Sequence, residues 1–246
     1  MSKTLNVTKT PGKKVLMVVS NPSVSTTVGG PVGFWASELI HAWYAFVEAG
    51  YEATIASPKG GKVAFDSFSD PRDASGYSAE DILSMGFIHT PRLMALLENT
   101  PSIDCYTPAH FDAIVVAGGQ GPMFTFLNEH GLHTLLAGFY EAGKVTAALC
   151  HGVCALLYVK LSDGSHLIAG KTMTGFANVE EDFADSYVGQ PVMPFRIEDE
   201  AKKLGANFIT GGLFKEFAVR DGRLVTGQQQ YSGAATAHLV IEALGV

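Results

Sequence analysis

The stretch from Val145 to Leu157 constrains the fold of this chain most. An apolar run, 145–149, and a second apolar run, 153–157, flank the tripeptide Cys150-His151-Gly152. This pattern predicts a buried strand, one tight turn and then a helix. The small residues Ala148 and Gly152 stand two positions before and two after the cysteine, as a sharp turn needs, because larger side chains there would meet the neighbouring backbone. The spacing is that of a nucleophile elbow with cysteine in place of serine.

Apolar runs alternate with amphipathic stretches along most of the chain. Strands are expected at 14–20, 52–56, 113–117 and 145–149, and helices at 31–49, 132–142 and 233–244. Short, continuously apolar strands separated by helices predict an α/β fold whose parallel sheet is covered on both faces. The pair Asp221-Gly222 between two apolar runs predicts a hairpin near the carboxyl terminus.

Residues 59–106 interrupt this rhythm. They are rich in Ser, Asp, Pro and Gly, and a helix is expected only around Arg92–Glu98. Such a long excursion is either a surface loop or a lid beside an active site, and we favour the cap or lid. No repeat, low-complexity segment or linker divides the chain, so a single domain, 1–246, is predicted.

Composition excludes several classes of partner. The chain has 246 residues, a net charge of −7 and no block of basic residues, which argues against nucleic acid and anionic membranes as partners. No apolar run approaches the roughly 20 residues of a membrane helix. Residues 1–6 lack an apolar signal core, so a cytoplasmic location is expected. Three cysteines do not form a disulfide framework.

Cys150 is the first candidate catalytic residue. A thiol at the start of a helix is near free backbone N–H groups and the positive end of the helix dipole, which favour the nucleophilic thiolate. Cys154 lies one turn into an apolar stretch and is expected to be a buried structural residue. His151 follows the nucleophile directly, and spacing leaves two interpretations open: a base beside the thiol, or a histidine that is solvated or bonded to a loop.

Glu38 is the second candidate. At helical spacing it shares a face with Ala42, Ala45 and Ala49, which indicates close packing against the sheet. A carboxyl group on such a face loses water, which raises its pKa and makes it a candidate general acid or base. The alternative is a solvated glutamate on the outer face.

The glycine-rich segment 118–121 follows an expected strand. It lacks the spacing and the Lys-Ser/Thr pair of a phosphate-binding loop. The backbone N–H groups of Gly119 and His151 could instead form an oxyanion hole if their strands are neighbours. A plain turn at the end of a strand is the alternative.

Two further sets of polar residues have simple structural interpretations. Asn178 and Glu181 have the spacing of a capping box at the start of a helix. His130 and His133 are three residues apart, but no cysteine or carboxylate completes a metal site, and surface positions explain them better. Neither a metal nor another cofactor is predicted.

Taken together, these pieces resemble the DJ-1/PfpI superfamily, within the class I glutamine-amidotransferase-like folds, and more narrowly its heat-shock-31-like, glutathione-independent glyoxalase branch. The matching segments, in order along the chain, are 14–20, the helix with Glu38, 117–121, 148–152, 170–176 and 221–227. The resemblance implies a flavodoxin-like three-layer sandwich with a mostly parallel central sheet, a C-terminal hairpin, a cap-like insertion at 59–106 and a homodimer.

The resemblance also implies roles for particular residues. Cys150 would be the nucleophile, Glu38 the carboxyl group beside it, His151 the second member of a Cys-His-acid set and Glu181 the acid. The amides of Gly119 and His151 would form the oxyanion hole.

The leading hypothesis is a cysteine-dependent enzyme that converts methylglyoxal or related 2-oxoaldehydes to lactate or other 2-hydroxy acids without glutathione. This chemistry needs an exposed thiolate, a carboxyl group that holds a proton, and oxyanion donors. Alternatives with the same cysteine are an isonitrile hydratase and a thiol amide hydrolase or deglycase, and a complete Cys-His-acid geometry would favour a hydrolase. A stress-response holdase chaperone or a redox sensor is the non-enzymatic alternative.

Overall fold

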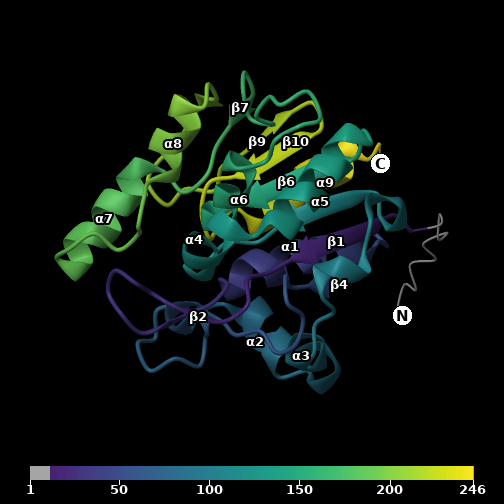
Figure 1. Ribbon diagram of the computed structural model, residues 1–246. Helices are drawn as coiled ribbons and strands as arrows, with labels where there is room; N and C mark the ends of the chain where they lie inside the picture. The colour runs from purple at the N-terminus through teal and green to yellow at the C-terminus, as the bar shows by residue number, and fades with distance from the viewer. Residues whose placement is uncertain (1–11, 246) are drawn as a thin grey trace.

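A central six-stranded sheet organises the computed structural model, which describes residues 12–245 (Figure 1). The strand order is β4-β1-β5-β6-β10-β9, and every neighbouring pair is parallel except β10 and β9, which form the expected hairpin. This is the predicted α/β fold. Residues 1–6, whose composition led us to expect a cytoplasmic location, lie outside the described range.

The strands that form the large sheet are β1 (Lys14–Val18), β4 (Glu52–Ala56), β5 (Ala113–Val116), β6 (Val145–Leu149), β9 (Ala218–Asp221) and β10 (Leu224–Gly227). Two small sheets are formed by β2 (Ser23–Val24) with β3 (Pro31–Val32), and by β7 (Thr172–Met173) with β8 (Asn207–Phe208).

The α-helices are α1 (Ala36–Glu48), α2 (Ile82–Ile88), α3 (Pro91–Glu98), α4 (Gly121–Thr125), α5 (His130–Glu141), α6 (Cys154–Leu157), α7 (Asn178–Val188), α8 (Ile197–Lys203) and α9 (Gly233–Ala243). Short 3₁₀ turns are η1 (Ser67–Ser69), η2 (Ile103–Cys105), η3 (Pro108–His110), η4 (Phe126–Asn128) and η5 (Cys150–Val153).

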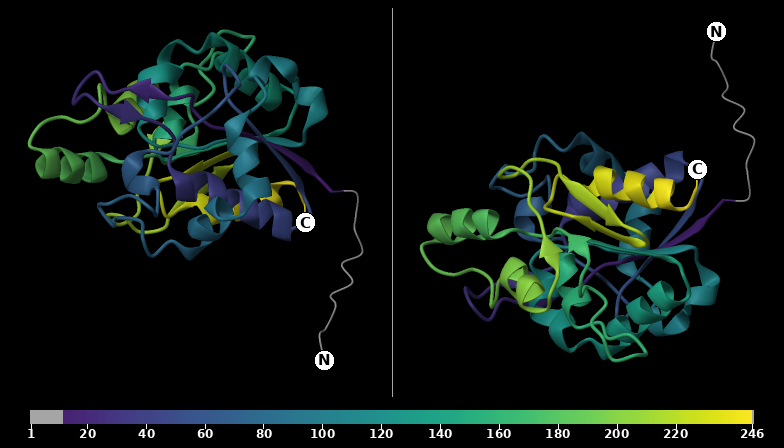
Figure 2. Two further views of the ribbon diagram at one scale, coloured as in Figure 1. Left: turned by 90° about the horizontal axis from the view of Figure 1, so that it is seen from below. Right: turned by 90° about the horizontal axis from the view of Figure 1, so that it is seen from above.

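Helices cover both faces of the sheet, which makes three layers (Figure 2). Alternate residues of β1 belong to different cores: Val15 and Met17 pack with α1 and α9, whereas Leu16 and Val18 pack with α5 and α6. Both faces of this strand are therefore apolar, and this is why it appears in the sequence as a continuous apolar run instead of an alternating one.

The helix expected at 31–49 begins later, at Ala36. Pro31 belongs to strand β3, and the chain stays extended because Phe34 forms a bridge with Phe65. A Cβ atom at Gly33 would lie 2.0 Å from the carbonyl oxygen of Ala64, so this close approach of two backbones requires glycine. The predicted helix start at Pro31 is therefore wrong, because this proline lies in a strand fixed by tertiary pairing.

Residues 59–106 contain two helices, α2 and α3, where the sequence predicted one. The missed helix, α2, is capped by Asp81, whose carboxylate accepts from the backbone amide of Ser84 at 3.0 Å. It packs against α1 and α3. The sequence did not indicate helix α2, because the Ser and Asp residues beside it are typical of both loops and helix caps.

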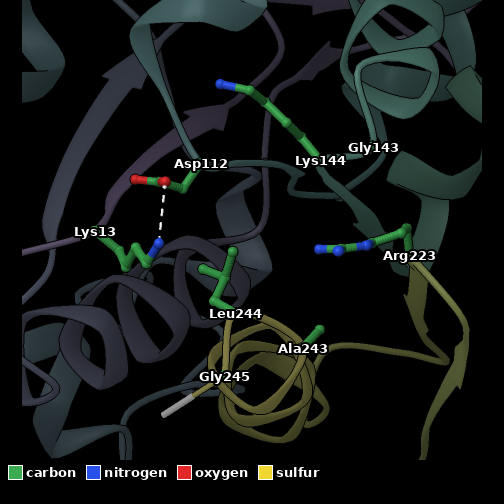
Figure 3. Close-up of a pocket in the computed structure, with 8 residues that line it drawn as sticks. All are labelled: Lys13, Asp112, Gly143, Lys144, Arg223, Ala243, Leu244 and Gly245. Atoms are coloured by element: carbon green, nitrogen blue, oxygen red, sulfur yellow. Dashed lines mark hydrogen bonds and ion pairs between the residues drawn. The ribbon is translucent and has the colours of Figure 1, made fainter.

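The two ends of the sheet differ in character. Lys13, Asp112, Lys144 and Arg223 line a surface hollow at the amino ends of β1, β5, β6 and β10 (Figure 3). Ligands of open α/β sheets bind at the carboxyl ends of the strands instead.

Helix α7 and the carboxyl end of helix α9 lie at opposite ends of the molecule (Figure 1). Within residues 12–245, no helix combines the length and apolar character that crossing a membrane requires.

Candidate active site

Cys150 lies at the carboxyl end of β6, at the turn predicted from the sequence. Its φ of 54° is in the left-handed region, which is rare for a residue with a side chain and is typical of a nucleophile elbow. A Cβ atom at Gly152 would lie 2.6 Å from the carbonyl oxygen of Ala117, so glycine is required there. The element after the turn is shorter than expected: one 3₁₀ turn and then the single-turn helix α6. Cys154 is fully buried, as expected.

Glu38 reaches the elbow from the first turn of α1. It is fully buried, together with Ala42 and Ala45, although Ala49 at the end of the helix is exposed. Its Oε2 atom accepts from the backbone N–H of Gly118 at 2.7 Å, whereas its Oε1 atom is buried without a hydrogen-bond partner among the described residues. The carboxyl group lies beside the Cys150 thiol and raises its pKa. Burial raises the pKa of Glu38 to about 8, so the group holds a proton at neutral pH.

The electrostatic environment of Cys150 differs from the expectation. The thiol is 2% exposed, and burial and the adjacent Glu38 raise its pKa well above the ordinary value. We expected the dipole of the following helix to lower the pKa of the Cys150 thiol. This expectation is wrong for the dominant effect, because the short turn after Cys150 offsets little of the cost of burying a charge. The structure therefore contains a buried pair of a carboxyl group and a thiol, and not the exposed thiolate that we expected. The protonation of one group of the pair depends on that of the other.

Two backbone amides point at the Cys150 thiol, those of His151 and Gly119, and both favour the thiolate. Strands β5 and β6 are direct neighbours, which brings the two loops together as the oxyanion hypothesis required. Gly119 has a φ of 104°, and a Cβ atom there would lie 2.4 Å from the amide nitrogen of Trp35. Only glycine fits this position.

His151 lies between the thiol and an acid. Its Nδ1 atom is 3.8 Å from Cys150 Sγ, and its Nε2 atom is 3.0 Å from Glu181 Oε1. The imidazole and the carboxylate are both buried. The structure thus places Cys150, His151 and Glu181 in one chain of contacts.

The capping interpretation of Asn178 and Glu181 is wrong. Helix α7 begins at Asn178, and the side chain of Glu180, not of Glu181, accepts from the backbone N–H of the cap residue Ala177 at 2.9 Å. The neighbouring carboxylate, Glu181, is left to face His151. A shift of one residue turns a helical side chain by about 100°, which the sequence spacing could not resolve.

The surface interpretation of the histidine pair holds for one member only. His130 is exposed, but His133 is buried and its Nε2 atom contacts the carbonyl oxygen of Phe126 at 2.8 Å. Among residues 12–245, no three His, Cys, Asp or Glu side chains form a group that could hold a metal ion.

Sequence reasoning missed Asp66. This buried carboxylate accepts from the backbone N–H groups of Gly33, at 2.8 Å, and Gln120. It therefore joins the segment 59–106 to the loop that carries Gly119. Burial raises its pKa to about 6. Its position in a Ser- and Asp-rich stretch gave no signal, because aspartate is ordinary in loops.

Cys150, His151 and Glu181, which are all buried, line a cavity of about 280 Å³. Its walls are mainly aromatic and aliphatic side chains from α7, from the loops beside it and from residues 66–77. Residues of the segment expected to act as a cap, Phe68 and Tyr77, line this cavity. A cavity with an apolar wall and a few converging polar groups is typical of a small-molecule site.

The fold and the site define a class: three-layer α/β proteins that present a cysteine on a nucleophile elbow beside a buried carboxyl group. The chain belongs to the DJ-1/PfpI family, whose model matches residues 30–243.

Its curated relatives carry enzyme names. The chain is 31% identical over 242 residues to the probable glutathione-independent glyoxalase hsp3103 of Schizosaccharomyces pombe, covering 88% of this chain and 92% of that protein. It is 28% identical to the glutathione-independent glyoxalase HSP31 of Saccharomyces cerevisiae, covering 95% and 98%. The crystal structure of glyoxalase III from Candida albicans is similar, with a TM-score of 0.79 and 27% identity over 94% of this chain and 97% of that one.

Proposed function

We propose that this chain is a glutathione-independent glyoxalase that converts methylglyoxal and water to lactate. One observation carries the proposal: a buried carboxyl group, whose pKa is raised to about 8, lies beside the cysteine at the elbow. The names of the relatives, which share the fold over nearly the whole chain, support the same reaction.

The reactive state is the acid–thiol pair of Glu38 and Cys150 after it has released one of its two protons to solvent, with the remaining proton on Glu38. In the first step, the Cys150 thiolate of this state adds to the aldehyde carbon of the substrate. A C–S bond forms, and the carbonyl π electrons move to oxygen, where the amides of Gly119 and His151 stabilise the negative charge. Glu38 gives its proton to this oxygen, which yields a neutral hemithioacetal and leaves Glu38 as a carboxylate. Because its pKa is raised, that carboxylate is a stronger base than an ordinary glutamate.

In the second step, the Glu38 carboxylate removes the proton from the former aldehyde carbon, and the electron pair moves to the ketone oxygen, which gives an enediolate. The same group returns the proton to the neighbouring carbon, the hydroxyl proton on the sulfur-bearing carbon moves to the enediolate oxygen, and the product is a lactoyl thioester on Cys150. A single buried group can serve both carbons because they are adjacent in the substrate. Water then hydrolyses the thioester, which releases lactate and restores the thiol.

His151 is suited to the hydrolysis step. Its contact with Glu181 at 3.0 Å orients the imidazole, so that it can accept a proton from the attacking water. Glu181 would then be the orienting acid of the set.

The same contact supports a second candidate, a thiol amide hydrolase or deglycase. A complete Cys-His-acid set is the arrangement that such an enzyme uses. Here His151 Nδ1 lies 3.8 Å from Cys150 Sγ, and His151 Nε2 lies 3.0 Å from Glu181 Oε1. The glyoxalase remains the better proposal, because an amide hydrolase has no use for a protonated Glu38 within reach of the thiol.

Two further expectations belong to the proposal. A homodimer is expected, and light scattering coupled to size exclusion tests it by the mass in solution. A cytoplasmic location is also expected, and cell fractionation tests it.

The decisive experiment follows lactate after purified protein is mixed with methylglyoxal in the absence of glutathione. Cys150→Ser and Glu38→Gln should each lower kcat/KM by about 1,000-fold or more, because each removes a group that the first bond changes require. The matched control is Cys105→Ser, since Cys105 is exposed and lies outside the cavity.

Lactate formation that survives either catalytic substitution would refute the mechanism. Release of ammonia or a free amine from an amide or glycated substrate, without lactate from methylglyoxal, would favour the hydrolase instead.

A further inference from the structure

We infer that the preferred substrates are 2-oxoaldehydes with a large apolar group on the ketone carbon, such as an aryl group, and that methylglyoxal only partly fills the site. This inference rests on the proposed function and specifies its substrate class. The observation behind it is the cavity beside Cys150, which is lined by two separate sets of aromatic side chains, its first and second walls.

The first wall is a series of rings that starts at the catalytic histidine. His151 and Phe176 have ring centroids 4.1 Å apart, Phe176 and Phe214 6.5 Å apart, and Phe214 and Phe183 5.3 Å apart. The rings therefore run from the histidine beside the reacting sulfur to Phe183 on α7, an exposed side chain. Phe214 has a φ of 48°, and its amide donates to the Glu180 carboxylate at 3.2 Å, so its position is fixed by the backbone.

The second wall comes from other parts of the chain. Trp35 and Tyr77 have ring centroids 5.9 Å apart in an edge-to-face arrangement, and Phe68 lies 6.2 Å from Tyr77. Gln230 donates to the Tyr77 hydroxyl at 3.2 Å, which satisfies the polar end of that side chain. Contacts between rings and hydrogen bonds thus hold the aromatic side chains of both walls in position. Flat apolar groups pack well against aromatic rings of this kind.

The size and charge of the cavity narrow the substrate class. Its volume of about 280 Å³ is close to the lower limit of sites for drug-sized ligands, about 300 Å³, and a three-carbon aldehyde fills little of it. Among the described residues, no lysine or arginine lines the cavity, and its one carboxylate, Glu181, is engaged with His151. Nothing there would offset the charge of a phosphorylated or carboxylated substrate, so a neutral apolar group fits best.

The bound orientation follows from the proposed chemistry. The aldehyde carbon must reach the buried Cys150, so the group on the ketone carbon extends toward the exposed lining residues Phe183 and Phe68. A substrate with a phenyl group gains contacts there that a methyl group cannot make. These contacts hold the reacting carbons beside Glu38, so they should affect kcat/KM.

The test compares phenylglyoxal, which takes up water to give mandelate, with methylglyoxal, which gives lactate. We expect kcat/KM for phenylglyoxal to be about tenfold higher. Phe183→Ala and Phe68→Ala, one substitution in each wall, should each lower the phenylglyoxal-to-methylglyoxal ratio by about fivefold to tenfold. Val179→Ala is the matched control, because Val179 is an exposed apolar residue on the same helix as Phe183 but does not line the cavity.

The outcomes are distinguishable. If lactate forms but phenylglyoxal is no better a substrate, or if the ratio is unchanged in both wall variants, the inference is overturned and the proposed function stands. If neither lactate nor mandelate forms, the proposed function fails, and the inference fails with it.

Discussion

At the scale of single residues, the central feature is the shared protonation of Glu38 and Cys150. Both groups are buried, and burial raises both pKa values. Glu38 raises the pKa of Cys150 further, whereas the Cys150 thiol offsets part of the rise at Glu38, so near neutral pH the pair carries at most one charge. An enzyme that must first attack and then move a proton benefits from this arrangement. When the Cys150 thiolate attacks the substrate, Glu38 gives up its proton and takes on the negative charge. Glu38 is then a base for the next step, the removal of a proton from carbon.

The raised pKa of Glu38 predicts a specific pH dependence of stability. The folded state keeps its proton up to about pH 8, whereas the unfolded chain releases it near pH 4.5, so the free energy of unfolding falls as pH rises between these values. From about pH 6 to about pH 8.5, wild type should lose about 2–3 kcal/mol relative to Glu38→Gln, which has no proton to lose there. Urea denaturation of both proteins at the two pH values measures this difference. Parallel pH profiles would show that Glu38 is not protonated in the folded protein.

At the scale of elements, the shape of the elbow depends on glycines that let two loops approach closely. Strands β5 and β6 end side by side, and their loops approach so closely that Gly118, Gly119 and Gly152 have no room for a methyl group. A Cβ atom at Gly118 would lie 2.7 Å from Glu38 Oε2 and 2.8 Å from the amide nitrogen of His151. The same crowding that fixes the left-handed backbone at Cys150 brings the amides and the acid to the sulfur.

Alanine substitutions at two glycines should therefore have opposite effects on stability. Gly152→Ala places a methyl group against the carbonyl oxygens of Ala117 and Val116 and should lower the free energy of unfolding by about 2–4 kcal/mol. Gly86→Ala should raise it by about 0.5–1 kcal/mol, because Gly86 is exposed within helix α2 and an added methyl group would meet no atom within 4 Å. Thermal unfolding of the two variants beside wild type checks both signs. A Gly152→Ala protein as stable as wild type would mean that the elbow is looser than described.

At the scale of the whole molecule, segments far apart in the sequence meet at the carboxyl end of the sheet. Helix α1 brings Glu38, β6 brings Cys150, α7 brings Glu181, and residues 59–106 bring Asp66 and part of the cavity wall. Helices α7 and α8 lie between β7 and β8 in the chain and stand at one end of the molecule (Figure 1). The site is thus a product of assembly, and its precision depends on the contacts that join these segments.

Asp66 is the contact whose loss should matter most for this assembly. Asp66→Ala leaves the buried amides of Gly33 and Gln120 without their acceptor and should cost about 2–4 kcal/mol of stability. It should also expose residues 67–80 to limited proteolysis before the rest of the chain. Asp73→Ala is the control, because Asp73 is only partly buried and its carboxylate accepts from the amide of Ser75, just two residues away. Equal cleavage of the two variants would show that Asp66 does not hold the segment.

Much of the fold could be predicted because its signals are local. The apolar runs of β1, β5 and β6 and the Asp-Gly turn between β9 and β10 depend on near neighbours in the sequence, and the structure has all of them. The errors arose where tertiary contacts override local preference. Pro31 has the features of a helix start, yet it lies in a strand because residues 33–35 are held by distant segments, among them residues 64–66.

The sequence by itself determined the elbow and the parallel sheet, because both depend on spacing and on small residues, and it favoured the burial of Glu38 over a solvated position. Only the tertiary structure decided which of two adjacent glutamates faces His151, because a turn of about 100° separates them on the helix. It also decided the charge state of Cys150, since burial and a carboxyl group 112 positions earlier in the chain outweigh the local turn. A pattern along the chain predicts which groups are present. Their protonation depends on the water excluded and the charges brought near when the chain is folded.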